Sequence, residues 1–332
     1  MVLIIPCLTI HYISYKSLTK QVLLLYEFNN TSFILSLSEL DEISDDFPNL
    51  TETALPIKTM KARYFYLNNQ YVLSHNSNSC ASEMTFGLYL PETPSSTKLP
   101  IIWFLSGLTC THENAMVKSG IQKWASEKKV AIVFPDTSPR GETVADDSSF
   151  DLGQGAGFYV NSLRSPWKKN YQMWSYVLEE LPEVIFNSFA IDNEKQSIMG
   201  HSMGGLGALN MAFRNPQIFK AVSAFAPIAN PTAGAWGRKQ FEAYLGSDEK
   251  CWEEYDPSIL LSKRGYVGRI LIDQGSKDNF LDNLSPKSLE ELVSTSHEDN
   301  LFRYQEGYDH SYFFVSTFIQ EHIFWHEKQL RG

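Results

Sequence analysis

The stretch IMGHSMGGLGALNMAFRNP, Ile198 to Pro216, places a serine between two glycines in the pattern Gly-X-Ser-X-Gly. The short apolar run before Ser202 predicts a buried strand, and the small and apolar residues after it predict a helix that ends at Asn215-Pro216. Ser202 therefore falls on a sharp turn from strand to helix. A side chain at Gly200 or Gly204 would collide with neighbouring backbone in such a turn, which explains why both positions are glycine.

This turn suits a serine nucleophile. The helix that follows Ser202 offers unpaired N–H groups and the positive end of its dipole to a developing oxyanion. A Gly-X-Ser-X-Gly pattern also occurs by chance in a glycine-rich turn with no chemical role. The strand before the turn and the helix after it favour the nucleophile elbow of an α/β-hydrolase over chance.

The rest of the sequence alternates apolar strands with helices, as this fold requires. Apolar runs predict strands over residues 84–91, 101–107, 130–136, 195–200, 220–227, 269–275 and 301–305. Helices are expected over residues 114–129, 170–186 with a kink or new turn at Pro182, 204–214, 285–296, and after Ser311. This alternation predicts an α/β-hydrolase fold with a mostly parallel central sheet and helices on both faces.

The composition narrows the class of partner. The chain has 332 residues, of which 43% are hydrophobic, enough to form a core without metals or disulfides. Its net charge is −10, and its Lys and Arg residues are scattered, which argues against nucleic acid or an anionic membrane as the main partner. Four cysteines lie far apart without a Cys-X-X-Cys spacing, typical of neither a zinc site nor a disulfide framework: Cys7, Cys80, Cys110 and Cys251. A reducing compartment and a small-molecule or protein partner are therefore expected.

A serine nucleophile needs a base, and that base needs an acid to orient it. In α/β-hydrolases the acid and then the histidine follow the serine, on loops at the carboxyl ends of later strands. Asp278 lies in the loop after the strand RILIDQG, whereas Asp273 lies nearer the strand end and is less able to reach across. Asp278 is therefore the predicted acid.

The predicted base is His310, in the string EGYDHSYFF between the last strand and the closing helix. His297 falls in a polar patch before that strand, and His322 and His326 belong to the closing helix. The chain order of serine, acid and His310 agrees with a catalytic triad. His201, although next to the serine, is expected to project away from it.

The oxyanion hole needs two backbone donors. The N–H of Met203 is one by position, because it follows the nucleophile. The second donor is expected in the loop after an early strand, where FLSGLTCT offers the N–H of Leu108 with Gly107 permitting the turn. An ordinary connection between strand and helix is the alternative interpretation of this loop.

Seven strings resemble the S-formylglutathione hydrolase family: WFLSGLTCT, PDTSPRG, GQGAGFYV, GHSMGG, FAPIANP, LIDQG and QEGYDHSYFF. They occur in the family's order, and the resemblance runs from about Tyr71 to Lys328. It implies a cytosolic serine thioesterase, often a homodimer and without metal or organic cofactor. Such an enzyme hydrolyses S-formylglutathione to glutathione and formate in formaldehyde detoxification, and also cleaves simple carboxylic esters.

The resemblance carries the family's functional residues onto this chain. It implies a triad of Ser202, Asp278 and His310, with oxyanion donors at Leu108 and Met203. Cys110 matches a thiol near the family's active site, and is otherwise a small buried hydrophobe. Other residues fall in strings that shape loops near the pocket or serve as scaffold: Asp136, Arg140, Tyr159, Trp167 and Trp236. Of these, Trp236 and Tyr159 are the expected substrate-pocket residues.

Residues 1–57 have no counterpart in the family and carry a net charge of −5, half that of the chain. The opening MVLIIPCLTI is apolar but lacks a basic n-region and is too short to span a bilayer, which disfavours a secretory signal. The apolar runs at residues 21–28 and 32–37 fit a strand or a helix equally well. We predict an N-terminal extension over residues 1–57, or a translation start near Met60, followed by an α/β-hydrolase catalytic domain over residues 58–332.

Three other functions are compatible with parts of the sequence. A general carboxylesterase or lipase would use the same triad, but no apolar lid segment is recognisable. A non-catalytic protein built on a former hydrolase would be expected to have a damaged triad, and here the triad is complete. A secreted hydrolase would require the N-terminal apolar run to act as a signal. Ala235 stands where the family commonly has proline before Trp-Gly, a departure that does not touch the triad.

Overall fold

The computed structural model describes residues 24–28, 31–35, 57–65, 68–94 and 97–331. The chain divides into two compact units, residues Met1–Thr53 and Ala54–Gly332. In the first unit, β1 (Leu24–Phe28) pairs with β2 (Thr31–Leu35) in antiparallel register. The opening apolar run and Cys7 lie outside the described residues, and the extent of an N-terminal extension remains a prediction.

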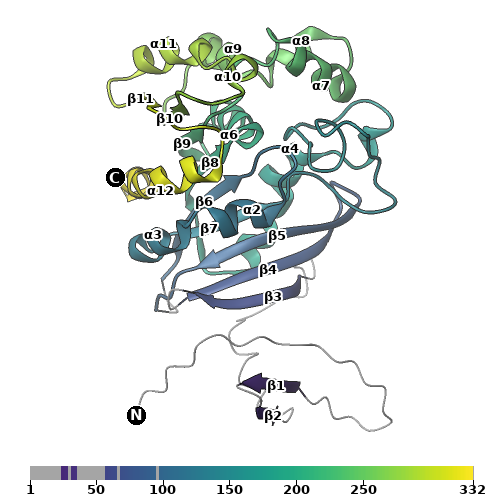
Figure 1. The fold of residues 1–332 in the computed structure, drawn as a ribbon, viewed down its shortest axis with the longest axis vertical. Helices are drawn as coiled ribbons and strands as arrows, with labels where there is room; N and C mark the ends of the chain where they lie inside the picture. Colours follow the sequence, from purple (N-terminus) through teal and green to yellow (C-terminus); the bar gives the residue numbers. More distant parts are fainter. Residues whose placement is uncertain (1–23, 29–30, 36–56, 66–67, 95–96, 332) are drawn as a thin grey trace. The chain divides into compact units, whose positions relative to one another are not determined.

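The second unit is built on a nine-stranded sheet of order β11-β10-β9-β8-β6-β7-β5-β4-β3 (Figure 1). The strands from β11 to β7 are all parallel, and β5, β4 and β3 join antiparallel at one end. The bounds of the strands are β3 Lys58–Phe65, β4 Asn68–Ser77, β5 Ser82–Leu90, β6 Leu99–Leu105, β7 Ala131–Pro135, β8 Ile191–His201, β9 Phe219–Phe225, β10 Arg269–Gly275 and β11 Leu301–Gln305. The mostly parallel sheet is confirmed.

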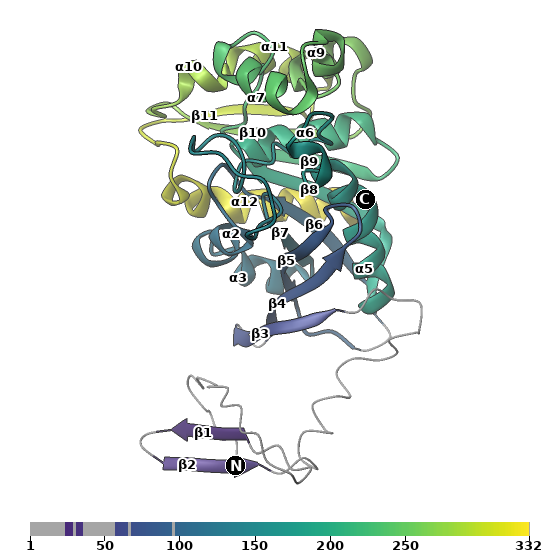
Figure 2. The same cartoon turned by 90° about the vertical axis from the view of Figure 1, so that its right-hand side faces the viewer.

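Helices cover both faces of this sheet (Figure 1, Figure 2). Their bounds are α2 His112–Lys118, α3 Ile121–Lys128, α4 Met173–Ser175, α5 Leu181–Ser188, α6 Met203–Arg214, α7 Ala235–Leu245, α8 Glu249–Glu253, α9 Pro257–Arg264, α10 Leu281–Leu284, α11 Lys287–Ser296 and α12 Tyr312–Arg331. Two successive residues of β9 show the two faces: Ser223 bonds to His322 of α12, whereas Ala224 lies against Gly205 of α6. No helix among these residues is long and apolar enough to cross a membrane.

Two predicted helices differ from those observed. The predicted helix over residues 114–129 is divided into α2 and α3, because Gly120 adopts a left-handed φ of 68° between them. The helix over residues 170–186 is α4, a π-helical segment Tyr176–Glu180 and α5, so the irregularity falls directly before Pro182, as predicted. The helices α7, α8 and α9 were not predicted.

Candidate active site

Ser202 lies at the junction of β8 and α6, where the backbone is strained. Its φ of 59° and ψ of −119° are unusual for a residue other than glycine. Two backbone hydrogen bonds hold this conformation: the N–H of Ser202 donates to the carbonyl of Phe225 at 2.9 Å, and the N–H of Leu206 donates to the carbonyl of Ser202 at 3.0 Å. Strain maintained in this way is characteristic of functional turns.

The two glycines of the motif allow the turn to close. A Cβ atom on Gly200 would lie 2.1 Å from the carbonyl oxygen of Gly204, and a Cβ atom on Gly204 would lie 2.0 Å from the carbonyl oxygen of Leu105. Neither distance is compatible with a side chain, so the predicted reason for these glycines is confirmed. Helix α6 consequently begins in direct contact with the end of β6.

The structure brings the predicted acid and base together. His310 Nδ1 lies 2.6 Å from Asp278 Oδ2, and the carboxylate also accepts from Gln274 Nε2 at 3.0 Å and from the N–H of Phe280 at 2.8 Å. The Asp278 side chain is fully buried and that of His310 is 17% exposed. A carboxylate on Nδ1 fixes the tautomer of the imidazole and leaves Nε2 able to accept a proton.

The contact between His310 and the nucleophile turn runs through His201. The two imidazole rings lie 4.6 Å apart, and no hydrogen bond joins the Ser202 hydroxyl to His310 among the described residues. Such bonds are often long without substrate and tighten when it binds. His201, expected to project away from the serine, packs its ring against His310 and Tyr312, and burial holds its pKa well below the usual value.

Asp273, the other acid near this loop, is engaged elsewhere. Arg303 binds its two carboxylate oxygens at 2.6 and 2.7 Å, and His322 Nε2 lies 3.3 Å away. Burial alone would raise the pKa of Asp273, but His322 and Arg303 outweigh it and hold the pKa at about 2. A carboxylate with these partners is not available to His310.

The predicted oxyanion donors lie on two sides of Ser202. The turn from Gly107 to Cys110 lies against the nucleophile, since a Cβ atom on Gly107 would be 3.1 Å from Ser202 Cβ. The N–H groups of Leu108 and Met203 have no protein acceptor among the described residues. Both groups are therefore free to donate to an oxygen atom of a bound substrate.

The three remaining predicted residues have different surroundings. Cys110 is half-buried in the Gly107–Cys110 turn, and burial raises the pKa of its thiol. Tyr159 is only 1% exposed, and its hydroxyl donates to the Ser106 carbonyl at 2.9 Å, which is a supporting position beneath the turn. Trp236 packs against Phe158 and donates to Asp151 Oδ2 at 2.8 Å. The pocket roles of Trp236 and Tyr159 remain predictions.

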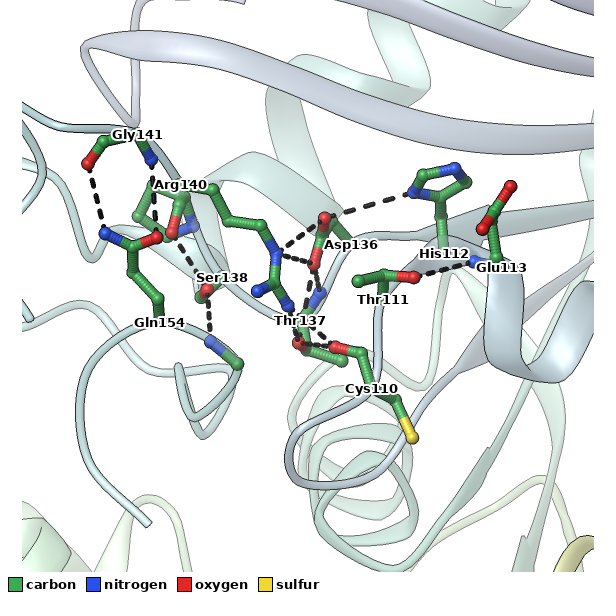
Figure 3. Close-up of polar contacts among 12 residues, drawn as sticks. Cys110, Thr111, His112, Glu113, Asp136, Thr137, Ser138, Arg140, Gly141 and Gln154 are labelled. Carbon is green, nitrogen blue, oxygen red and sulfur yellow. Dashed lines mark hydrogen bonds and ion pairs between the residues drawn. The ribbon is translucent and has the colours of Figure 1, made fainter. Parts of the chain in front are cut away.

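A polar network holds the Cys110 end of the Gly107–Cys110 turn (Figure 3). Arg140 connects the carboxylate of Asp136 to the carbonyl of Cys110, and Thr137 donates to the same carbonyl. The string PDTSPRG predicted loop-shaping residues here. Its residues Thr137 and Arg140 contact Cys110 across 27 and 30 residues of sequence, so no local sequence pattern could predict these contacts. No group of three or more His, Cys, Asp or Glu side chains within the described ranges is arranged to hold a metal ion.

Comparison with known proteins extends these observations. The Esterase family model matches residues 77–325. An S-formylglutathione hydrolase of Paracoccus denitrificans (strain Pd 1222) is 53% identical over 261 residues, covering 79% of this chain and 94% of that protein.

Solved structures agree with this match. The S-formylglutathione hydrolase of Agrobacterium tumefaciens superposes with a TM-score of 0.79 at 43% identity, covering 82% of this chain and 99% of that one. A fluorophosphonate-binding serine hydrolase of Staphylococcus aureus has a TM-score of 0.61 at 21% identity, over 78% of this chain and 98% of that one, which supports the fold alone.

Proposed function

Because this chain belongs to the Esterase family and, within it, to the S-formylglutathione hydrolases, we propose that it hydrolyses S-formylglutathione to glutathione and formate, with side activity on short carboxylic esters. The chain is a serine hydrolase of the α/β-hydrolase fold. The observation that carries the proposed mechanism is the 2.6 Å contact of His310 Nδ1 with a fully buried Asp278, next to the strained turn of Ser202.

In the first half of the reaction, His310 Nε2 removes the hydroxyl proton of Ser202 as its oxygen attacks the formyl carbon. The N–H groups of Leu108 and Met203 stabilise the oxyanion that forms. The carbon–sulfur bond of the tetrahedral intermediate then breaks, and the imidazolium of His310 donates the proton taken from Ser202 to the departing glutathione sulfur. A formyl ester of Ser202 remains on the enzyme.

In the second half, a water molecule replaces the glutathione thiol. His310 takes a proton from this water while the oxygen of the water attacks the formyl ester. The same two N–H groups stabilise the second oxyanion. Collapse of this intermediate releases formate and returns the proton to Ser202. Asp278 stabilises the imidazolium in both halves, which is the role its buried contact with His310 supports.

The test is the steady-state hydrolysis of S-formylglutathione and of a short-chain aryl ester by the purified protein. A much higher kcat/KM for the thioester is expected, with both activities lost in Ser202→Ala. Ser294→Ala removes a hydroxyl from the exposed face of α11 and serves as the matched control. Activity on the aryl ester alone would identify a general carboxylesterase with a different natural substrate, and turnover by Ser202→Ala would refute the mechanism.

We further propose that the protein is cytoplasmic and homodimeric, as the resemblance to its family suggests, and that residues 1–57 form an extension not needed for catalysis. Light scattering of the purified protein measures its oligomeric state. Abundant peptides from residues 27–58 in native protein would exclude a translation start near Met60. Deletion of residues 1–57 should leave kcat/KM unchanged.

A further inference from the structure

The turn that carries Leu108 is strained at its third residue. The N–H of Cys110 donates to the carbonyl of Gly107 at 3.3 Å and closes the turn, and Thr109 has a φ of 63°. Turns with a positive φ at the third position normally have glycine or asparagine there. A β-branched residue in this conformation is an outlier, so contacts outside the turn must maintain it.

Those contacts come from the segments after β7. The carbonyl of Cys110 accepts from Arg140 Nη2 at 2.8 Å and from Thr137 Oγ1 at 2.5 Å (Figure 3). On the other side of the strained residue, the N–H of Thr109 donates to the carbonyl of Gly155 at 2.9 Å. The peptide group before Thr109 and the one after Cys110 are thereby fixed, and the strained residue lies between them.

Asp136 in turn fixes Arg140. The Arg140 Nε atom lies 3.1 and 3.0 Å from the two carboxylate oxygens, and the side chains are 33% and 6% exposed for Arg140 and Asp136. The same carboxylate accepts from the N–H of Thr137 at 2.6 Å and lies 3.9 Å from His112 Nδ1. A planar guanidinium can bind a carboxylate and a carbonyl at once, whereas a lysine ammonium cannot reproduce that geometry.

We propose that Arg140, held by Asp136, is a positioning residue that fixes the Gly107–Cys110 turn and so directs the N–H of Leu108 at the oxyanion. The proposal rests on the proposed function, in which Leu108 is an oxyanion donor. Arg140 acts through the carbonyl of Cys110 and does not itself contact the reacting atoms. Its contribution is therefore expected in the transition state and not in the binding of substrate.

The test uses Arg140→Lys and Asp136→Asn with a short-chain aryl ester. Loss of one oxyanion donor lowers kcat by about 10²–10³-fold, so misdirection of Leu108 should lower kcat by about 10–100-fold with KM changed by less than about three-fold. A trifluoromethyl ketone adds to the serine hydroxyl, and its carbonyl oxygen becomes an oxyanion in the adduct. The affinity of the variants for this inhibitor should fall together with kcat. Arg214→Lys is the matched control, because Arg214 also binds a carboxylate and a carbonyl, both of Glu254, but at the far end of α6.

A second background separates positioning from general stability. Glycine tolerates the φ of residue 109, so Thr109→Gly should need the support of Arg140 less, and Arg140→Lys should cost a smaller factor in kcat in that background. The proposal is overturned if folded Arg140→Lys keeps the wild-type kcat and ketone affinity, or if its loss is the same in both backgrounds. Failure of the proposed function is a separate result, since it would appear in the wild-type protein as a lack of preference for S-formylglutathione.

Discussion

Gly204→Ala tests the close contact between α6 and β6 that forms the nucleophile turn. The added Cβ atom would lie 2.0 Å from the carbonyl oxygen of Leu105, whereas real Cβ contacts stay above 3.0 Å, so backbone must move by about 1 Å. The carbonyl of Ser106, at 2.6 Å, blocks the same space. Overpacking of a core costs about 1–3 kcal/mol, and because backbone atoms obstruct this site we expect about 3 kcal/mol.

The same displacement should lower activity more than stability alone would. Moving the start of α6 moves the hydroxyl of Ser202 and the N–H of Met203 relative to His310, which Asp278 holds from the loop after β10. A misplacement of about 1 Å costs about 10²-fold in rate. We therefore expect kcat/KM for an aryl ester to fall by about 100-fold in protein that is still folded.

Urea unfolding followed by circular dichroism measures the loss of stability. Ester hydrolysis without urea, at a temperature where the variant is folded, measures the loss of kcat/KM. Gly234→Ala is the matched control, because a Cβ atom there meets nothing within 4 Å and the φ of −90° suits alanine. If Gly204→Ala stayed within about 0.5 kcal/mol and about two-fold of the wild type, the reasoning would be refuted.

Three further predictions concern titratable groups. Asp278→Asn should lower kcat by about 10⁴-fold, whereas Asp273→Asn should mainly lower the free energy of unfolding, and equal losses of kcat would contradict these roles. Burial lowers the pKa of His322 and His326, so only the unfolded chain gains these protons below about pH 6.5, and the free energy of unfolding should fall as the pH drops from there; a flat urea-unfolding profile between about pH 7 and 5 would contradict this. Burial raises the pKa of Cys110, so iodoacetamide should alkylate it more slowly than free cysteine at the same pH, and an equal or faster rate would refute this.

The elements that local sequence predicts best are the strands covered on both faces. Such strands read as mainly apolar runs, and the predicted bounds of the buried strand β10 agree with the structure to the residue. The bounds of β11 also agree, although this edge strand is partly exposed. The nucleophile turn was also predictable, because its steric demands leave a glycine pattern in adjacent positions. The helices α7, α8 and α9 were not, since they mix polar and apolar residues and leave only a weak periodic pattern.

Most features of the site that the sequence did not predict are contacts between segments far apart in the chain. Arg140 reaches Cys110 across 30 residues, and His201 reaches the ring of His310 across more than 100. Neither contact follows from periodicity, because periodicity reports only which face of an element is buried. The contact of the His201 ring with His310 was not predicted for this reason: the sharp turn was inferred from local sequence, but the ring that packs against His201 comes from another part of the chain.

The two acids near the end of β10 also show what sequence alone leaves open. Asp273 can only accept, so His322 carries its hydrogen on Nε2, and its Nδ1 accepts from the hydroxyl of Ser223 at 2.8 Å. That hydroxyl must then accept from His326 Nε2, also at 2.8 Å. Burial lowers the pKa of both histidines and so favours their neutral forms, and with both neutral this arrangement of hydrogens satisfies all three contacts.

This buried layer also supports the nucleophile turn, which explains why the acid of the proposed triad lies one loop further on. The ring of Phe225 stacks on His322 with centroids 3.9 Å apart, and the carbonyl of Phe225 accepts the N–H of Ser202. Asp273 therefore stabilises the floor on which Ser202 is placed, and using it as the acid would remove the partner that holds His322. Asp278, reached by the chain after β10 has ended, is free of that layer and can turn its carboxylate to His310.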